Sequence, residues 1–319
     1  TDDFSTEIKV AYKEVETGQD PSTKEFGDIT VQTDSGRVAF GADKYRHGNE
    51  LDNQTLSLRF LGEYLYEDHE IAFGLEYESI DVRNLFAADS LGTWEFDSIA
   101  DFANQTASGL DYANAYTNNS DDVAAEFTFA NTTLFVEDSL QLTDTFILTA
   151  GLRYEMITSD DKPAFNQNFY DRYQFSNSTN LDGESIFLPR IAFEWEASDD
   201  LVVRGGIGRF SGGSPNVWLS NAYSNDGITY VTGSVSYDDL LNADITKLPQ
   251  SVLDSMSPGD GNVNVTDPNF KLPSDWRSSI AFDYTFAVPD LGDDWLWTSE
   301  YIYTKKKDSV FWTDLTRQK

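Results

Sequence analysis

Cysteine is absent from the 319 residues, and histidine occurs only twice. These scarcities exclude disulfide scaffolds, thiolate chemistry and nearly all histidine-based metal sites. Long hydrophobic runs are missing as well, and without 18 consecutive apolar residues the chain has no transmembrane helix. Basic residues are few, with 22 Lys and Arg against 55 Asp and Glu, which gives a formal charge of −33. Such a charge excludes nucleic acid as a default partner, because phosphate backbones bind positive surfaces.

Aromatic residues, in contrast, make up 14% of the chain. Disordered acidic chains are poor in aromatics, so this chain is expected to fold. Apolar and polar residues alternate with the period of a β-strand. In residues 146–157 one face carries Phe, Leu, Ala, Tyr and Met, whereas the other carries mainly Thr, Gly, Arg and Glu. The same division recurs in residues 56–66, 71–78, 190–196 and 280–286. In residues 127–142 alternation alone does not show which residues share a face.

Strand length and loop asymmetry indicate a membrane barrel. The alternating runs reach about ten residues, the length that a tilted strand needs to cross a bilayer, and globular strands are usually shorter. Tight turns at 67–69, 143–145, 198–200 and 289–294 alternate with long connections at 83–122, 159–183 and 211–273. Bacterial outer-membrane barrels combine short periplasmic turns with long extracellular loops. We therefore expect an all-β, transmembrane, antiparallel up-and-down barrel in the outer membrane of a Gram-negative bacterium; a soluble β-protein with large insertions is the alternative.

About ten strands are expected, including residues 6–15, 29–42 and 295–304. Residues 248–256 are expected to form a short surface helix within the longest loop.

Three segments resemble a known family in that family's order. The run LFVEDSLQLTDTFILTAGLRYE, residues 134–155, is similar to the central barrel signature of TonB-dependent receptors. Residues 188–218, LPRIAFEWEASDDLVVRGGIGRFSGGSPNVW, are similar to the following hairpin of the Oar-like branch, and residues 267–286, DPNFKLPSDWRSSIAFDYTF, resemble the next strand entry. The resemblance implies an energised importer whose plug domain fills a 22-stranded barrel, the size at which a lumen needs plugging. It also implies coupling to an inner-membrane TonB complex.

The chain departs from that family in four features. We find no N-terminal plug, no TonB-contact segment and no aromatic C-terminal ending, and about ten strands is roughly half of the implied barrel. Because unpaired backbone groups are costly in lipid, residues 1–319 are expected to be part of one barrel domain, completed by missing segments or by other chains.

Candidate binding residues lie in the longest loop and inside the barrel. The loop combines aromatic faces with amides and a carboxylate, as ligand sites often do; these residues are Asn216, Trp218, Asn221, Tyr223, Asn225, Asp226 and Tyr230. Folding of the loop over the barrel mouth is the alternative role. A charge ladder between neighbouring strands is expected in the lumen, formed by Arg153, Glu155, Arg190, Glu194, Glu196 and Arg204.

Other chemistry is weakly indicated. Oxygen ligands at alternate positions make Asp260, Asn262, Asn264 and Asp267 candidate ligands of a loop-bound Ca²⁺. The EF-hand pattern is not met, because Val265 and Lys271 replace its Gly and Glu. No other cofactor or metal is expected. His47 and His69 lack a nucleophile elbow, and the loop carboxylates are expected to be solvated charge, so no catalytic residue is assigned.

The leading hypothesis is a TonB-dependent receptor that captures a scarce small molecule, peptide or glycan and is not an enzyme. Its expected partners are outer-membrane lipid, the ligand and the TonB complex, with surface proteins as a further option. The alternatives are a structural or export-linked barrel that scaffolds surface proteins and, less favoured, an outer-membrane hydrolase.

Overall fold

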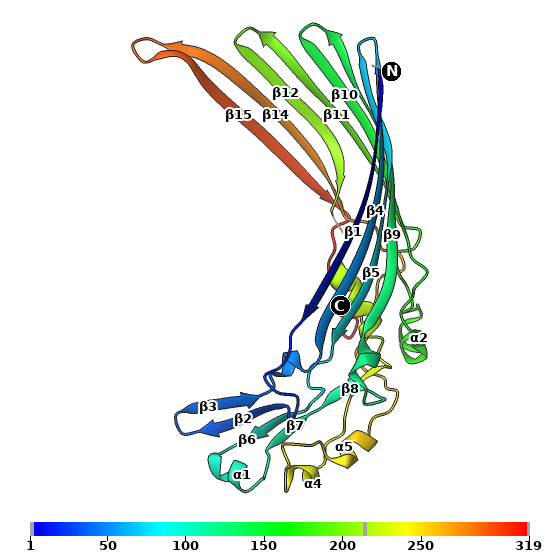
Figure 1. Cartoon of the computed structure of the whole chain (residues 1–319), viewed down its shortest axis with the longest axis vertical. Helices are drawn as coiled ribbons and strands as arrows, with labels where there is room; N and C mark the ends of the chain where they lie inside the picture. Colours follow the sequence, from blue (N-terminus) through cyan, green and yellow to red (C-terminus); the bar gives the residue numbers. More distant parts are fainter. Residues whose placement is uncertain (1–2, 213–215, 318–319) are drawn as a thin grey trace.

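A long sheet of nine antiparallel strands dominates the computed structural model, which describes residues 3–212 and 216–317 (Figure 1). The strands neighbour one another in the order β1-β4-β5-β9-β10-β11-β12-β14-β15. Their bounds are β1 Phe4–Gly18, β4 Asn49–Tyr66, β5 His69–Phe86, β9 Ala125–Thr143, β10 Phe146–Thr158, β11 Ser185–Ser198, β12 Leu201–Ser211, β14 Ser274–Val288 and β15 Gly292–Lys307. Within the described residues the sheet is open, because β1 pairs only with β4 and β15 only with β14.

Short turns join the strands at one end and long loops join them at the other (Figure 1). The turns lie between β4 and β5, β9 and β10, β11 and β12, and β14 and β15, which confirms all four turns expected from the sequence. The long loops span residues 19–48, 87–124, 159–184 and 212–273. No helix in the described ranges is long and apolar enough to cross a membrane.

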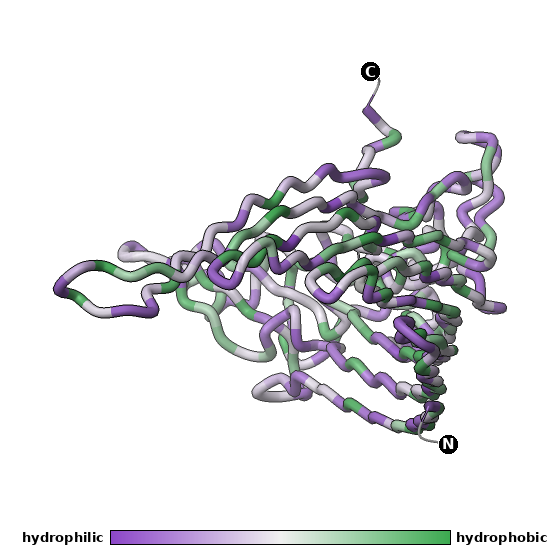
Figure 2. The backbone as a smooth tube through the Cα atoms, turned by 90° about the horizontal axis from the view of Figure 1, so that it is seen from above, coloured by the Kyte–Doolittle hydropathy of each residue, from purple (hydrophilic) through white to green (hydrophobic). Residues whose placement is uncertain are grey.

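Hydrophobic and hydrophilic residues alternate along the chain (Figure 2). Near the turns, opposite chemistry distinguishes the two faces of the sheet. Directly paired residues of antiparallel strands share a face, so the registers define rows across the sheet. One row consists of Ile8, Phe60, Leu75, Leu134, Tyr154 and Phe187. The adjacent row on the other face includes Arg59, Glu76, Thr133 and Glu155. We call these the apolar face and the polar face. The sheet therefore has the two-sided character of a barrel wall, in which the apolar face is the one expected to be toward lipid.

Toward the loops, this distribution inverts. Val82 and Phe127 occupy positions of the polar face, yet they are buried beneath Leu219 and Tyr223 from the longest loop. On the opposite face at this height, Arg83 contacts four carboxylates, those of Glu50, Asp52, Asp121 and Glu126. Residues 127–142 thus begin with Phe127 and Phe129 on one face and continue with Leu134 and Val136 on the other. The inversion explains why alternation alone does not assign the faces of this strand.

Strand glycines make room for aromatic rings of neighbouring strands. A Cβ atom added to Gly205 would lie 2.7 Å from the Phe193 ring, and one added to Gly62 would lie 2.6 Å from the Phe73 ring. The glycine-rich run of β12 therefore serves packing between neighbouring strands.

The loops fold into a cap with its own hydrophobic core. Its four-stranded sheet has the order β3-β2-β6-β7, formed by β3 Gly36–Gly41, β2 Asp28–Thr33, β6 Thr93–Phe96 and β7 Gly109–Asp111. A two-stranded sheet joins β8 Ala113–Ala115 to β13 Tyr230–Thr232. The short helices are η1 Lys44–Arg46, α1 Ile99–Ala103, η2 Ser120–Val123, α2 Gln167–Tyr173, α3 Asn216–Ser224, α4 Tyr237–Leu240 and α5 Gln250–Asp254. Ile29, Trp94 and Val252 are fully or almost fully buried in this core, which therefore joins residues from three loops.

Two sequence expectations change in the cap. Residues 29–42 are not a barrel strand: they form the β2–β3 hairpin, which pairs with β6 in the cap, so the main sheet has nine strands. The chain reverses at Asp34 and Ser35, and Gly36 has a φ of 147°, which a residue with a side chain rarely adopts. The helix expected at 248–256 is present as α5, but Val252 is completely buried, so this helix belongs partly to the core.

Candidate ligand site at the loop end of the sheet

A cavity near the loops has a volume of about 810 Å³. It lies between α3, the segment 264–271 and residues 308–315, which follow β15. Aromatic side chains from these three parts and from the loop 159–184 line it: Phe175, Trp218, Phe270, Phe311 and Trp312. Pockets of this volume with apolar walls and a few polar groups are typical small-molecule sites.

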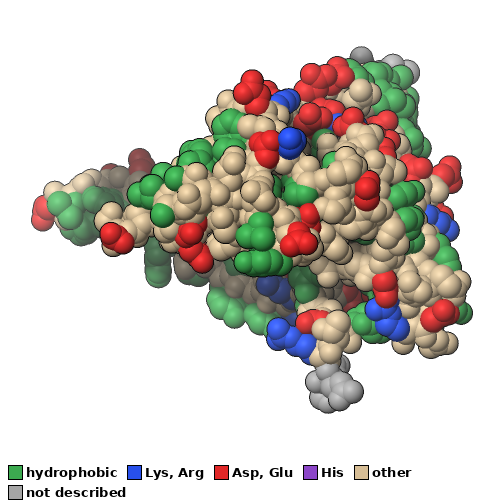
Figure 3. Space-filling view, turned by 90° about the horizontal axis from the view of Figure 1, so that it is seen from below, with side chains coloured by type: hydrophobic (Ala, Val, Ile, Leu, Met, Phe, Trp, Pro, Cys, Tyr) green, Lys and Arg blue, Asp and Glu red, His purple; other side chains and the backbone are tan. Residues whose placement is uncertain are grey.

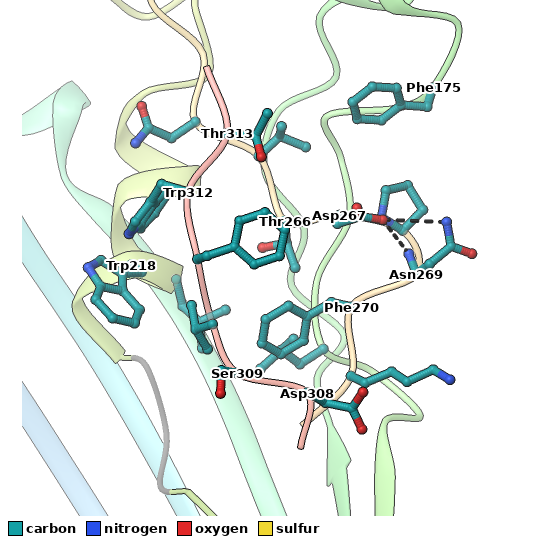
Figure 4. A pocket seen from close by; sticks show the side chains of 18 of the residues that line it. Phe175, Trp218, Thr266, Asp267, Asn269, Phe270, Asp308, Ser309, Trp312 and Thr313 are labelled. Atoms are coloured by element: carbon teal, nitrogen blue, oxygen red, sulfur yellow. Dashed lines mark hydrogen bonds between the residues drawn. The ribbon is translucent and has the colours of Figure 1, made fainter. Parts of the chain in front are cut away.

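Two tryptophans from distant parts of the chain form one wall (Figure 4). The rings of Trp218 and Trp312 are 5.5 Å apart and nearly perpendicular, at 88°. Their side chains remain 44% and 55% exposed, so each keeps a surface available to a ligand. Opposite them, Asp267 accepts a hydrogen bond from the backbone N–H of Asn269 at 2.7 Å, which fixes the turn next to Phe270.

Of the loop residues expected to bind ligand whose side chains the structure describes, Trp218 alone lines this cavity. Tyr223 instead stacks on Phe127 of the sheet at 4.5 Å, and its hydroxyl donates to the Asp161 carbonyl at 2.8 Å. The Tyr230 hydroxyl donates to the Ala88 carbonyl at 2.6 Å. Burial raises the pKa of both phenols to about 12, so both remain protonated donors at neutral pH. These two tyrosines attach the loop to the barrel wall and to the cap.

The other loop candidates make local contacts. Asp226 is buried and accepts hydrogen bonds from the backbone N–H groups of Ile228 and Thr229. Asn221 and Asn225 are joined through the backbone at the end of α3. Asn216 begins α3, but its side chain lies outside what the structure describes. We assign these groups to the folding of the loop.

Part of the expected charge ladder is paired on the polar face of the sheet. Arg153 lies 2.8 Å from Glu76 and 2.7 Å from Glu155. Arg190 pairs with Glu137 at 2.5 Å and Arg204 with Asp283 at 2.6 Å. The acidic partners of these three arginines include Glu76, Glu137 and Asp283, which were not among the residues expected from the sequence. Ion pairs between strands depend on how neighbouring strands are aligned, and the sequence alone does not give that alignment.

Glu194 and Glu196 form no ion pair in the described part of the chain, although Glu194 lies directly opposite Arg204. Glu194, Arg190 and Arg204 border a second recess of about 620 Å³ on the polar face. Charged side chains line part of this recess, and it is separate from the aromatic cavity.

The four oxygen-bearing residues considered for Ca²⁺ have different partners. Asp260 pairs with Arg172, and Asp267 accepts from its own turn. Asn264 and Asp267 line the aromatic cavity, and Asn262 lies on the same irregular segment. Within the described ranges no group of three or more His, Asp or Glu side chains could hold a metal ion.

The histidines have separate structural environments. The Nδ1 atom of His69 lies 2.8 Å from Asp138 beside a tight turn. The Nε2–H of His47 donates to the Ala42 carbonyl at 3.0 Å, and its Nδ1 accepts the Leu91 N–H at 3.1 Å. Burial lowers the pKa of His47 below its ordinary value, although Asp89, Asp28 and Asp43 act in the opposite direction. His47 therefore joins two loops in its neutral form.

The pH dependence of this junction is testable. A histidine whose folded pKa is lowered stabilises the fold above its unfolded pKa of about 6.5, and that contribution is lost as the pH falls toward the lowered value. Protonation also removes the Nδ1 acceptor from the Leu91 N–H. We expect hydrogen exchange in residues 87–92 to accelerate between pH 7.5 and 5.5, after correction for intrinsic rates. His47→Gln should remove this excess acceleration; an unchanged pH response in the variant would contradict the assignment.

Acidic side chains are scattered over the loop end (Figure 3). Residues 87–124 contain seven acidic residues and no basic one, and residues 225–273 contain seven acidic residues and two lysines. The field around the cavity therefore disfavours an anionic ligand.

Comparison with known proteins assigns the family. The model of the outer membrane beta barrel domain matches residues 4–310, and the chain belongs to this family. It is consequently a β-barrel protein of the Gram-negative outer membrane, and the soluble alternative is wrong. No curated protein matches the chain.

Solved structures of outer-membrane transporters are similar to this chain at low sequence identity, and the first of those named here supports the fold. The outer membrane transporter YddB from Escherichia coli gives a TM-score of 0.54 at 15% identity, over 94% of this chain and 31% of that one. The ferric-catecholate import receptor Fiu from E. coli K12 gives 0.47 at 12% identity, over 99% and 40% of the chains. The FrpB iron transporter from Neisseria meningitidis gives 0.45 at 14%, over 96% and 34%. The chain spans about a third of the length of the first of these transporters.

Proposed function

We propose that this chain is part of the wall and extracellular cap of a TonB-dependent importer. In the complete protein, further strands would close a barrel of about 22 strands around a plug, the size at which the lumen is plugged. The single observation that carries the proposal is the open aromatic cavity at the loop end of an outer-membrane barrel wall. Membership of the Oar-like branch is part of the proposal and rests on the sequence resemblance.

The short-turn and long-loop ends give the wall its direction. Short turns of outer-membrane barrels lie on the periplasmic side, and this rule supports a position of the cap and its cavity outside the cell. A ligand captured there would face the lumen and the paired charges of the polar face. This arrangement suits capture followed by inward passage and requires no covalent step.

We further propose a neutral oligosaccharide as the ligand. The faces of Trp218 and Trp312 carry the negative side of the π-quadrupole, which attracts the polarised C–H groups of a sugar ring. Amide and hydroxyl groups around the aromatic walls, on Asn264, Ser309 and Thr313, can exchange hydrogen bonds with sugar hydroxyls. The acidic cap opposes anionic ligands, so uronates and anionic chelates fit less well.

Energised uptake and binding can be tested separately. Cells would receive fluorescent neutral hexasaccharides of glucose, xylose or mannose, with and without a proton uncoupler. We expect at least one hexasaccharide to accumulate, and we expect the uncoupler to abolish accumulation. Accumulation that survives the uncoupler, or export-linked defects without any uptake defect on deletion, would contradict the importer assignment.

The cavity is tested by Trp312→Ala in the purified protein. Loss of an aromatic anchor costs about 2 kcal/mol at binding hot spots, which corresponds to roughly a 30-fold weaker Kd. Tyr237→Ala is the matched control, because Tyr237 is 73% exposed on α4 and does not line the cavity. Equal effects of the two substitutions on hexasaccharide affinity, measured by calorimetry, would show that the cavity is not the binding site.

A further inference from the structure

Three cations gather on the apolar face of β12 and β15, at the end nearest the loops. Arg209 lies directly opposite Trp276, and Trp276 lies directly opposite Lys305, so these three residues share one row. Lys307 follows two residues later on the same face and is opposite Ser274. We call Arg209, Lys305 and Lys307, together with Trp276, the basic row.

The basic row contrasts with the rest of the protein. The chain has 22 basic residues against 55 acidic ones, and on β4, β5 and β9 the corresponding loop-side region carries carboxylates around Arg83. Asp308 lies 3.9 Å from Arg209. In the described ranges no carboxylate lies within 4.0 Å of Lys305 or Lys307. Like charges at neighbouring positions repel one another, so an anion placed among them would be stabilised.

Strand geometry places the row at the edge of the membrane. On β15, Trp295 and Lys305 are ten residues apart on the apolar face. At about 3.4 Å per residue and a tilt of about 45°, they differ in height by roughly 24 Å. This height matches the apolar band of an outer-membrane barrel, about 25 Å. With Trp295 at the periplasmic boundary, Lys305 reaches the head groups of the outer leaflet.

Arg209 is held in position within this row. Its Nε and Nη2 atoms donate to the Ser274 hydroxyl at 3.1 and 3.0 Å. Lys305 and Lys307 are exposed and extend from the last strand of the sheet. A fixed guanidinium beside two free ammonium groups and an indole forms a surface for a phosphate next to an acyl chain.

We propose that the basic row binds the phosphate of a phosphorylated lipid in the outer leaflet. Trp276 would lie along the upper part of the acyl region while Lys305 and Lys307 contact the phosphate. The proposal is independent of what the cavity imports. Lysine side chains at a membrane boundary can contact any anionic or polar head group. The basic row, in contrast, is proposed to bind lipid only when the lipid carries a phosphate.

Binding to lipid A provides the test. The intact protein in detergent would be mixed with bis-phosphorylated lipid A or with the same lipid after enzymatic dephosphorylation, and bound lipid would be counted by native mass spectrometry. Each lysine near an anionic surface contributes about a fivefold preference, so Lys305→Gln with Lys307→Gln should weaken binding of the phosphorylated lipid about 25-fold.

A matched double substitution removes the same charge elsewhere. Lys306→Gln acts on the opposite face of the same strand, and Lys247→Gln acts in the cap, where Lys247 pairs with Asp244. This control should leave lipid A binding unchanged. Equal binding of the dephosphorylated lipid, an equal loss in the control, or displacement of the lipid by millimolar inorganic phosphate would each overturn the proposal.

Discussion

Replacing Ile191 by arginine should lower the free energy of unfolding in lipid vesicles by about 2–4 kcal/mol, the cost of a cation at the middle of the lipid face. Ile191 is 46% exposed on the apolar face of β11 and lies between Ala150 and Ile207. It is the central member of the apolar positions 187–195, so its side chain cannot reach either membrane boundary without strain. Urea unfolding followed by tryptophan fluorescence would measure the change.

The neighbouring residue supplies the control. Ala192 lies at the same height on the polar face, opposite Thr149 and Gly206, beside the recess that Glu194 borders. Ala192→Arg should therefore change stability much less than Ile191→Arg. If the two variants lost similar stability, the apolar face would not be in contact with hydrocarbon, and the proposed orientation of the wall would fail.

The barrel wall could be predicted because successive residues of a strand that crosses a bilayer face lipid and lumen in turn, and the residue types alternate accordingly. The face of each residue from Phe146 to Ile157 follows from alternation, and the turn at Thr143–Thr145 follows from its polar residues. Alternation does not tell where a strand leaves the membrane. Residues 29–42 alternate in the cap as they would in the wall, because a sheet packed on a cap core also has a buried face.

The candidate site was less predictable because distant segments form it. Trp218 could be selected as an aromatic residue in a long loop. Trp312 and Phe311 follow the last strand, and only the folded loops bring them to α3. A cluster of three large apolar residues, Val310, Phe311 and Trp312, outside any alternating run was the available signal. Tyr223 and Tyr230 are of the residue type that often binds ligands, but their hydroxyls already donate to backbone carbonyls of the protein itself.

The cap should unfold separately from the wall when its core is truncated. Trp94 is 1% exposed and packs in the core with Phe96, Leu110 and Val252. Trp94→Ala removes the largest of these side chains, and truncation of a buried Trp costs about 3–5 kcal/mol. Because its contacts are confined to the cap, we expect faster hydrogen exchange in β2, β6 and α5 and unchanged exchange in β9 to β12.

Ile99→Ala is the corresponding surface control, since Ile99 is 65% exposed on α1 of the same cap. This variant should change exchange in β2 and β6 only slightly. Uniform destabilisation of cap and wall by Trp94→Ala would mean that the two parts unfold as one unit. Selective loss of the cap, in contrast, would also reduce hexasaccharide binding if the loops around Trp218 depend on it, because Tyr230 joins that loop to Ala88 and pairs with Ala115 of β8. The ordered cap would then be what holds the aromatic cavity in place above the barrel mouth.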